Sequence, residues 1–271
     1  MIRSLRASSL AGIIFLLLSS TISFAQTQTI FFQPPTYPGP GVTATADFNQ
    51  DGKLDLITSH GTLLLGNGDG TFRKGTALLV STPSLNSIAV ADFNHDGKPD
   101  VLLASTQTTE LYVFLGNGDG TFRPTPTNIG VFLSNFAVAD VNGDGIPDVV
   151  GTIGSNGGAS TTVWVFLGKG DGTFTVPGRS FSAATIPIGL LLLGDFNGDG
   201  SVDVALTGPG SGTIAEPVGI MLGDGHGSFQ APIVSTAVVN PKEMIAGDFN
   251  GDLTSISLSA ISPLLFRHIC F

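Results

Sequence analysis

Short apolar runs separated by polar turns recur along the chain. One kind of run leads into an aspartate-rich loop, as Ser87–Phe93 does, and a second leaves the loop, as Asp100–Ser105 does. A third run, Leu111–Gly116, is apolar on both faces, which is typical of a strand buried on both faces. An Asp-Gly pair after this run predicts a hairpin turn, and a fourth strand is expected to begin at Phe122. Each unit is therefore predicted to contain four β-strands.

This unit recurs with a regular period. Successive loops start 45, 48, 55 and 53 residues apart, at Asp47, Asp92, Asp140, Asp195 and Asp248. Such a period is typical of propellers and repeat arrays, and four short strands per unit fit stacked propeller blades. An immunoglobulin-like array would need about 100 residues per unit, and we find no helical period. We therefore predict an all-β fold, a β-propeller with four full four-stranded blades and an incomplete fifth.

The loops carry oxygen-bearing side chains at fixed positions. In the second copy, Asp92, Asn94, Asp96 and Asp100 occupy positions 1, 3, 5 and 9, and Gly97 permits a sharp turn. Position 7 contributes its backbone carbonyl. Ca²⁺ prefers such hard oxygen donors, and without Cys or His among them zinc is not expected. The predicted ligands are Asp47, Asn49, Asp51, Lys53 and Asp55; Asp92, Asn94, Asp96, Lys98 and Asp100; Asp140, Asn142, Asp144, Ile146 and Asp148; and Asp195, Asn197, Asp199, Ser201 and Asp203.

The distribution of aspartates supports this interpretation. All 18 lie in two recurring motifs: fourteen in the five loop motifs, and the others at Asp69, Asp119, Asp171 and Asp224 in the hairpin turns. Asp, Asn and Gly are also common turn formers, but four copies in one register favour a metal site. Two unit charges 4 Å apart repel by about 4 kcal/mol at an effective dielectric near 20. Three carboxylates in one loop therefore predict a divalent cation. An EF-hand is excluded, because position 12 carries no glutamate and the flanks are strands.

A second motif, LGNGDGTF, follows the third strand of each unit. It occurs at Leu65–Phe72, with equivalents at Leu115–Phe122, Leu167–Phe174 and Leu222–Phe229. We interpret it as a hairpin turn, because it has neither the Gly-x-Gly-x-x-Gly spacing nor the Lys-Ser/Thr of a phosphate-binding loop. Its four phenylalanines are expected to anchor the blade cores. In an up-and-down blade this turn and the aspartate loop lie at the same end, so all aspartates are expected there.

The Asp-x-Asn-x-Asp-Gly-x-x-Asp loop and the Gly-Asn-Gly-Asp-Gly-Thr-Phe turn resemble the FG-GAP and VCBS repeats of integrin-α-type β-propellers. The resemblance covers about Ile30 to Asp252. It implies calcium-binding propeller blades. It is weak for function, because such repeats serve adhesion proteins, lectins, enzyme appendages and other secreted proteins. Propellers of this family usually have more blades than the five loop starts found here, so the ring is expected to be open or truncated.

Charge and the N-terminus bear on where the protein works. The 271 residues carry a net charge of −10, and an acidic chain argues against a nucleic-acid partner. Residues 1–25 combine Arg3 and Arg6 with an apolar run and a Ser-Phe-Ala end, which is typical of a secretory signal peptide. The run is shorter than the ~20 residues of a membrane span, although an uncleaved anchor is the alternative. We expect an extracellular or periplasmic protein without a membrane span after cleavage.

The two ends of the mature chain decide whether the ring closes. Residues 26–252 hold the repeats and residues 253–271 a divergent tail. The segment Thr29–Gly41 aligns with a fourth strand, whose natural partner is the last blade. In the fifth loop Leu253 replaces the glycine and Ile256 the last aspartate, and the tail shows no pattern of further strands. We predict that the fifth site binds no metal, that the ring is incomplete, and that the chain self-associates through unpaired edges.

These observations favour a secreted, calcium-binding recognition or adhesion module for a protein or glycan. The alternative is a structural repeat module or a truncated piece of a larger secreted protein. A lectin or an appendage of a carbohydrate-active enzyme is less favoured, because Tyr112 and Trp164 lie in the third strands, which are predicted to be buried. The four histidines are scattered, and no Ser/His/Asp or paired-acid constellation stands apart from the metal loops. An enzyme is therefore not expected.

Overall fold

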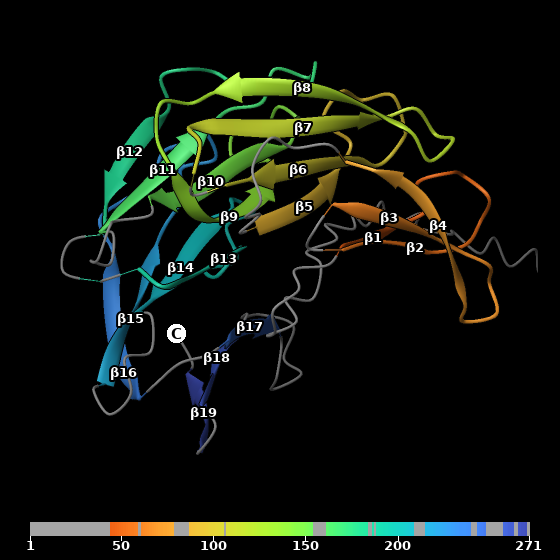
Figure 1. Ribbon diagram of the computed structural model, residues 1–271. Coiled ribbons are helices and arrows are strands. Elements are labelled where there is room, and N and C mark those ends of the chain that lie inside the picture. The colour runs from red at the N-terminus through yellow and green to blue at the C-terminus, as the bar shows by residue number, and fades with distance from the viewer. Residues whose placement is uncertain are drawn as a thin grey trace, which may run out of the picture. The chain divides into compact units, whose positions relative to one another are not determined.

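The computed structural model describes residues 44–58, 61–78, 87–105, 107–153, 161–183, 186, 188–208, 215–239, 243–247, 257–262 and 265–269. Its strands form antiparallel sheets, and the described ranges contain no helix (Figure 1). Accordingly, no helix in these ranges has the length and hydrophobicity of a membrane span. The expected signal peptide, the segment Thr29–Gly41 and the fifth loop lie outside them.

Four sheets contain four strands each, and within each sheet the strands are paired in chain order. This confirms the predicted four full blades. Blade 1 contains β1 (Ala44–Ala46), β2 (Asp55–Ile57), β3 (Thr62–Gly66) and β4 (Phe72–Ala77). Blade 2 contains β5 (Ser87–Ala91), β6 (Asp100–Ala104), β7 (Glu110–Gly116) and β8 (Phe122–Asn128). Blade 3 contains β9 (Leu133–Ala139), β10 (Asp148–Ile153), β11 (Thr162–Phe166) and β12 (Arg179–Ser182). Blade 4 contains β13 (Leu190–Gly194), β14 (Asp203–Thr207), β15 (Ala215–Met221) and β16 (Ile233–Val239).

The fifth sheet has three strands, β17 (Glu243–Gly247), β18 (Ser257–Ser262) and β19 (Leu265–Ile269). The prediction of an incomplete fifth blade is confirmed. The expectation that the tail lacks further strands is wrong, since β18 pairs with β17 and β19 pairs with β18. The reason lies in Ser257–Ala260, where polar and apolar residues alternate with the period of two that suits a strand.

The hydrophobic core lies between consecutive blades. One cluster joins Phe48 and Leu63 of blade 1 to Leu103 of blade 2. A second joins blades 2 and 3 through residues such as Phe93 and Phe166, and a third joins blades 3 and 4. A smaller cluster in blade 4 packs against Met244 of β17. Each blade therefore buries its apolar faces against its neighbours in sequence, as blades of a propeller do.

Burial within a blade differs from the prediction in one respect. The third strand was expected to be buried on both faces, but in β7 the half-buried Tyr112 lies between buried residues. The second strands β6 and β14 are buried at every position. Tyr112 donates a hydrogen bond to Glu110, and Trp164 of β11 stacks on Phe166 with the two rings nearly parallel. Both side chains are therefore engaged inside the blades.

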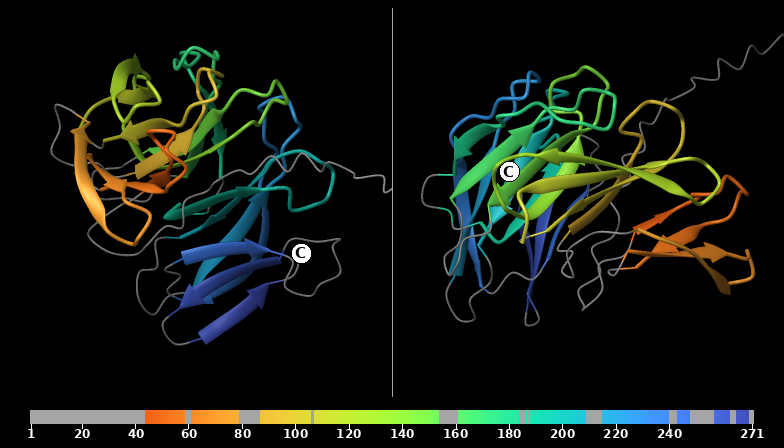
Figure 2. Two further views of the ribbon diagram at one scale, coloured as in Figure 1. Left: turned by 90° about the vertical axis from the view of Figure 1, so that its right-hand side faces the viewer. Right: turned by 45° about the horizontal axis from the view of Figure 1, so that its top comes forward.

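The blades follow one another in chain order (Figure 2). The first strands make the contacts: β1 meets β5, β5 meets β9, β9 meets β13, and β13 meets β17. Among the described residues this series does not close into a ring, as predicted.

Candidate metal centre

Four loops connect the first and second strands of the four full blades. We call them loop 1 (Asp47–Asp55), loop 2 (Asp92–Asp100), loop 3 (Asp140–Asp148) and loop 4 (Asp195–Asp203). All four lie within the described residues, so every predicted ligand residue is placed. Positions 1 to 9 are counted from the first aspartate of each loop.

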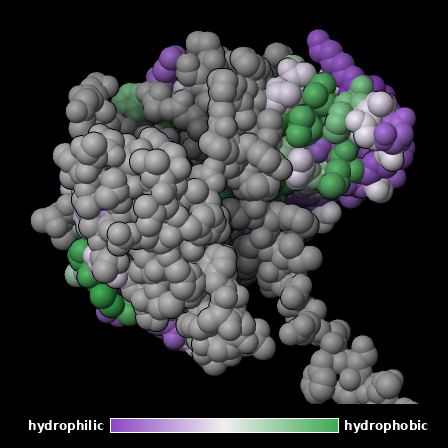
Figure 3. Space-filling model, turned by 90° about the horizontal axis from the view of Figure 1, so that it is seen from below, coloured by the Kyte–Doolittle hydropathy of each residue, from purple (hydrophilic) through white to green (hydrophobic). Residues whose placement is uncertain are grey.

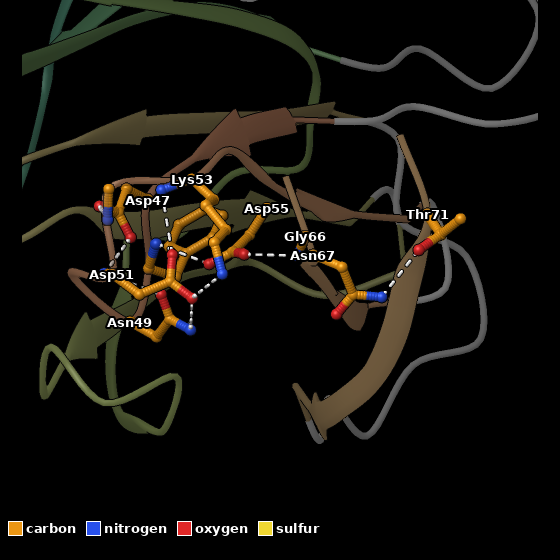
Figure 4. A network of polar contacts seen from close by, with 10 residues as sticks. Asp47, Asn49, Asp51, Lys53, Asp55, Gly66, Asn67 and Thr71 are labelled. Atoms are coloured by element: carbon orange, nitrogen blue, oxygen red, sulfur yellow. Dashed lines mark hydrogen bonds and ion pairs between the residues drawn. The ribbon is translucent and has the colours of Figure 1, made fainter. Parts of the chain in front are cut away.

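Each loop is wound around the aspartate at position 1. In loop 1, Asp47 accepts hydrogen bonds from the backbone N–H of Asp51 at 3.0 Å and of Gly52 at 2.7 Å (Figure 4). The same pair of bonds occurs in the other three loops. Gly52 adopts a φ of +81°, a conformation that favours glycine. The motif thus folds the backbone so that the side chains of positions 1, 3 and 5 lie around one turn.

Positions 3 and 5 contribute their oxygens to the same turn. In loop 1 the side-chain oxygen of Asn49 accepts the N–H of Asp51 at 3.2 Å, and its amide donates to Asp51 at 3.1 Å. Asp51 in turn accepts the N–H of Lys53 at 3.0 Å. These contacts hold carboxylate and amide oxygens next to one another on an exposed loop. Position 7, which is Lys53, Lys98, Ile146 or Ser201, has only its backbone carbonyl in common among the four copies.

The aspartate at position 9 has a different environment. Asp100 is fully buried and accepts two backbone hydrogen bonds, from Phe93 N at 2.9 Å and from Gly116 N at 2.7 Å. The equivalents Asp55, Asp148 and Asp203 are also buried and bond to the same two positions in their own blades. Each of them braces the aspartate loop to the hairpin motif, which places both motifs at the same end of the blade, as predicted.

A glycine makes this brace sterically feasible. A side chain on Gly116 would clash with the backbone carbonyl oxygen of Pro99, which precedes Asp100. Gly66, Gly168 and Gly223 are placed in the same way against position 8 of their own loops. Sequence reasoning did not find this link, although a signal was present: the first glycine of the hairpin motif occurs in all four copies together with the aspartate at position 9.

Burial shifts the pKa of three position-9 carboxylates, those of Asp100, Asp148 and Asp203. Burial raises the pKa of Asp100 and of Asp148 to about 6, although their N–H partners lower it, and burial also raises the pKa of Asp203. The carboxylates at positions 1 and 5 raise the pKa values further. Negative charge is therefore costly at this point of the loop, and a nearby cation would reduce that cost.

Loops 1 and 2 contain such a cation in their own sequence. The Lys53 ammonium lies 3.8 Å from Asp51, and the Lys98 ammonium lies 3.3 Å from Asp96. Desolvation raises the pKa of Asp96, but hydrogen bonds and Lys98 outweigh it and leave the pKa lowered. Loops 3 and 4 carry Ile146 and Ser201 at this position. Their aspartates therefore have no lysine at position 7 to offset their charge.

The donors fit Ca²⁺ by their chemistry. Within the described part of the chain, no three Asp, Glu, His or Cys side chains are close enough together to form a metal site on carboxylate, imidazole and thiolate groups alone. Each loop adds an asparagine oxygen and a backbone carbonyl, so the set consists of the hard oxygens that Ca²⁺ prefers. Positions 1, 3, 5 and 7 would hold the ion. The carboxylate at position 9 already has a backbone donor on each oxygen and would contribute a remaining lone pair.

The hairpin motifs are turns, as interpreted from the sequence. Asp119 accepts the backbone N–H of Thr121 at 2.9 Å, and the Thr121 hydroxyl also donates to it. The turns of blades 1 and 3 repeat these bonds. The acceptor oxygen of each turn aspartate is thus used to close its own turn.

A contact that the sequence did not predict joins the hairpins of blades 2, 3 and 4 to the preceding blade. Gly120 of blade 2 donates its N–H to the carbonyl of Phe48 in loop 1 at 3.1 Å, and the Phe122 ring packs edge-on against Phe48. Gly172 bonds likewise to Phe93 in loop 2, and Gly227 to Val141 in loop 3. We call this contact the hairpin–loop joint.

The joint shows which core each motif phenylalanine anchors. The motif phenylalanines were expected to anchor the blade cores, and Phe174 and Phe229 do lie in the buried clusters; Phe174 packs there against Phe93 of the preceding blade. Phe174 and Phe229 are 1% and 8% exposed, whereas Phe72 is 49% exposed. Phe72 belongs to the first described blade, and the structure describes no loop before it. An anchor of this kind is buried only where a preceding blade covers it.

Known proteins share the repeats of this chain. The family model of the FG-GAP-like repeat matches residues 47–103, 92–151, 140–206 and 195–254. No curated protein matches the sequence significantly. Among solved structures, one that is similar is titled "Crystal structure of BBS1N in complex with ARL6DN, soaked with lead", with 9% identity and a TM-score of 0.49. The match covers 81% of this chain and 62% of that one, so the chain spans less than two thirds of the length of that relative.

Proposed function

Because the chain belongs to the family of FG-GAP-like repeats, whose model matches most of its length, we propose that it is an exported recognition module stabilised by calcium. One observation carries the calcium assignment. Four loops present the same oxygen donors in the same register, and each contains a buried carboxylate at position 9. At Asp100, Asp148 and Asp203 the aspartates at positions 1 and 5 of the same loop make that negative charge less favourable. A bound divalent cation would offset this repulsion.

Binding of a macromolecule is the role that we assign to the assembled blades. The recurring polar groups are used in loop and hairpin hydrogen bonds, which suits a rigid scaffold better than a catalytic site. Connections on a rigid scaffold are where binding residues usually lie. A screen of glycans and surface proteins against the mature chain, with and without Ca²⁺, tests the proposed partner class. A purely structural module would bind none of them in either condition.

Calorimetric titration with Ca²⁺ tests the metal sites themselves. Extracellular modules often bind Ca²⁺ with dissociation constants of about 10⁻⁴–10⁻³ M. When the free Ca²⁺ concentration is about ten times the dissociation constant, one site stabilises the fold by about 1.4 kcal/mol. Asp96→Ala should remove one binding site, because it deletes a predicted ligand of loop 2. The matched variant Asp119→Ala should keep all sites, because that carboxylate closes the hairpin turn. Equal loss of calcium in both variants would contradict the assignment of the loops.

A further inference from the structure

The hairpin–loop joint has two halves, and the structure contains an unused copy of each. The donor half is the glycine N–H and phenylalanine of a hairpin; the acceptor half is the position-2 carbonyl and the asparagine beside it. Three complete joints link blades 1 to 4. The donor half of blade 1, formed by Gly70 and Phe72, and the acceptor half in loop 4, formed by Phe196 and Asn197, are in none of these three.

The donor half of blade 1 is open. A side chain added at Gly120, Gly172 or Gly227 would meet Leu65, Leu115 or Leu167 of the preceding blade at 3.5, 2.9 and 3.0 Å respectively. One added at Gly70 would meet no atom of the described residues within 4 Å. Phe72 is half exposed. On the side where blade 1 lies, hydrophobic and hydrophilic residues are exposed together (Figure 3). The Phe72 ring and the Gly70 N–H are therefore suited to contact an aspartate loop, but no loop of the described residues lies against them.

The acceptor half of loop 4 is open as well. Asn49, Asn94 and Asn142 are half buried in loops that a hairpin covers, whereas Asn197 is exposed. The fifth sheet lies beside β13, but its turn between β18 and β19 is at the end opposite to the loops, because Gly247 pairs with Ser257 at the loop end and Ser262 with Leu265 at the other. The described part of that sheet therefore supplies no hairpin to loop 4.

Charge selects between two ways of joining copies. Blade 1 carries Lys53, Arg73 and Lys74, all exposed, beside the exposed Asp51 and Asp69, whereas loop 4 carries Asp195 and Asp199 without a lysine at position 7. Two copies meeting through blade 1 on both sides would place the three basic side chains of one copy near those of the other, whereas blade 1 against loop 4 places them near Asp195 and Asp199. A head-to-tail contact of this kind uses different surfaces on the two copies.

We propose that the surface of blade 1 around Gly70 and Phe72 is an interface for loop 4 of a second copy of this chain. The second copy repeats the joint that the chain already makes three times within itself. Gly70 donates its N–H to the carbonyl of Phe196 of the second copy, and the Phe72 ring covers that loop. This contact leaves one open half on each outer copy, so association extends with concentration. The proposal is independent of the proposed recognition function.

Cysteine pairs test the contact directly. The Cβ position at Gly120 lies 3.7 Å from the Cβ of Asn49, within the range of disulfides. In a chain carrying Cys270→Ser, the pair Asn49→Cys and Gly120→Cys should form a disulfide within one chain. This pair is a matched control for the test below, because both pairs replace a loop asparagine and a hairpin glycine at positive φ. The test mixes one chain carrying Gly70→Cys with another carrying Asn197→Cys.

The mixture should give a covalent dimer of twice the chain mass under mild oxidation, and either chain alone should give at least several-fold less. No dimer from the mixture, while the control pair closes, would overturn the proposal. Equal dimer from Gly70→Cys alone would overturn it too, since that indicates a symmetric contact. A disulfide within a single chain carrying both Gly70→Cys and Asn197→Cys, without dimer, would show that the chain itself supplies the partner, which also overturns the proposal.

Sedimentation of the mature chain provides a second measurement without cysteines. The average mass should rise with protein concentration and stay at one chain for Phe72→Asp. Val176→Asp is the control, because Val176 is 46% exposed and lies outside the joint; it should associate like the unaltered chain. Association that survives Phe72→Asp, or that Val176→Asp abolishes equally, would contradict the proposed surface.

Discussion

Loops 1 and 2 differ from loops 3 and 4 at two positions of an otherwise common motif. At position 4, Gln50 and His95 adopt φ values of +55° and +57°, whereas Gly143 and Gly198 occupy this place in loops 3 and 4. At position 7 the first two loops carry a lysine paired with the aspartate at position 5, and the other two carry Ile146 and Ser201. The N-terminal pair of loops thus has its own counter-charge but a strained backbone.

The C-terminal pair has the opposite combination. Gly143 and Gly198 also donate their N–H to the aspartate at position 1, each at 2.7 Å, which adds a bond to the turn. Positive φ is a conformation that glycine adopts without the cost other residues incur. In loops 3 and 4 the backbone is unstrained, but no lysine at position 7 balances the carboxylates. The stability of these two loops should therefore depend more strongly on a bound metal ion. One motif can therefore be tuned without changing the fold.

The brace between the two motifs should be equally important in both halves. Gly116→Ala in blade 2 and Gly168→Ala in blade 3 each place a methyl group against a fixed carbonyl oxygen. We expect each to lower the free energy of unfolding by about 3 kcal/mol, as overpacking of a rigid site does. The control Gly97→Ala meets no atom within 4 Å and has only its φ of +78° against it, so about 1 kcal/mol is expected. Urea unfolding in calcium measures all three, and a much smaller loss in one blade would show that the halves do not share the brace.

The sequence predicted the blades and the loops because their signals are local. Strands, turns and the oxygen donors of each loop follow from residues close together in the chain. The brace, the joint and the exposure of Phe72 depend on pairs far apart in the chain, such as Gly120 and Phe48, which periodicity does not reveal.

Chain ends and fourth strands also escaped prediction. Phe122 begins β8 as expected, but Phe174 forms only an isolated bridge with Gly168, and β12 begins at Arg179. In blade 4 the bridge is between Phe229 and Gly223, and β16 begins at Ile233, directly after a proline. Proline lacks the N–H of a strand ladder. The tail misled prediction for another reason, because its alternating residues form strands without the motifs of the other blades.

Without calcium, Asp100 in loop 2 and Asp148 in loop 3 should make the fold less stable as pH rises, and to a similar extent. The pKa of Asp100 and Asp148 is about 6 in the folded state against 3.8 as the ordinary value. Between these values the folded state binds more protons than the unfolded state, so its stability is highest below about pH 4 and declines as pH rises through 6. The difference between the two pKa values corresponds to about 3 kcal/mol, and screening by solvent should lower the contribution of each group to roughly 2 kcal/mol.

Urea unfolding in EDTA across pH 4 to 7 measures this effect (roughly the span between the two pKa values). Asp100→Asn and Asp148→Asn should each flatten the decline by a similar amount, because Lys98 pairs with Asp96 rather than with Asp100. Asp119→Asn is the control, since the Thr121 hydrogen bonds lower the pKa of Asp119. If Asp148→Asn alone flattened the curve, Lys98 would have to neutralise the whole of loop 2.

Exchange of the position-4 residues tests the strain in the first pair of loops. His95→Gly removes a side chain held at a φ of +57°, and we expect it to stabilise the fold by about 0.5–1 kcal/mol. Gly143→His should cost a similar amount, because a Cβ added there would lie 3.6 Å from the nearest atom of the described residues and would meet no steric clash. Thermal unfolding in calcium compares both with the unaltered chain. A loss of stability in His95→Gly would indicate that the histidine makes a contact that offsets its backbone.

Exchange of the position-7 residues Lys98 and Ile146 should have the smallest effect on the free energy of unfolding. Its main effect should be on the affinity of loops 2 and 3 for calcium. The Lys98 and Ile146 side chains take the same path, passing 3.0 Å and 3.3 Å from the Cβ positions of Gly118 and Gly170. Either residue therefore fits either loop. The Lys98–Asp96 pair is partly exposed, and such pairs contribute about 0.5 kcal/mol after screening.

Lys98→Ile should thus destabilise the protein slightly in EDTA, and Ile146→Lys should stabilise it. In calcium the signs reverse, because the ammonium group competes with the ion for the aspartate at position 5. We expect Lys98→Ile to tighten one site about two- to threefold and Ile146→Lys to weaken one by a similar factor, which corresponds to about 0.5 kcal/mol. Calorimetric titration at low salt resolves this change, since screening by added salt should diminish it. Unchanged affinity in both variants would mean that the aspartate at position 5 is not a ligand, and the contrast between the loops would then concern the metal-free protein alone.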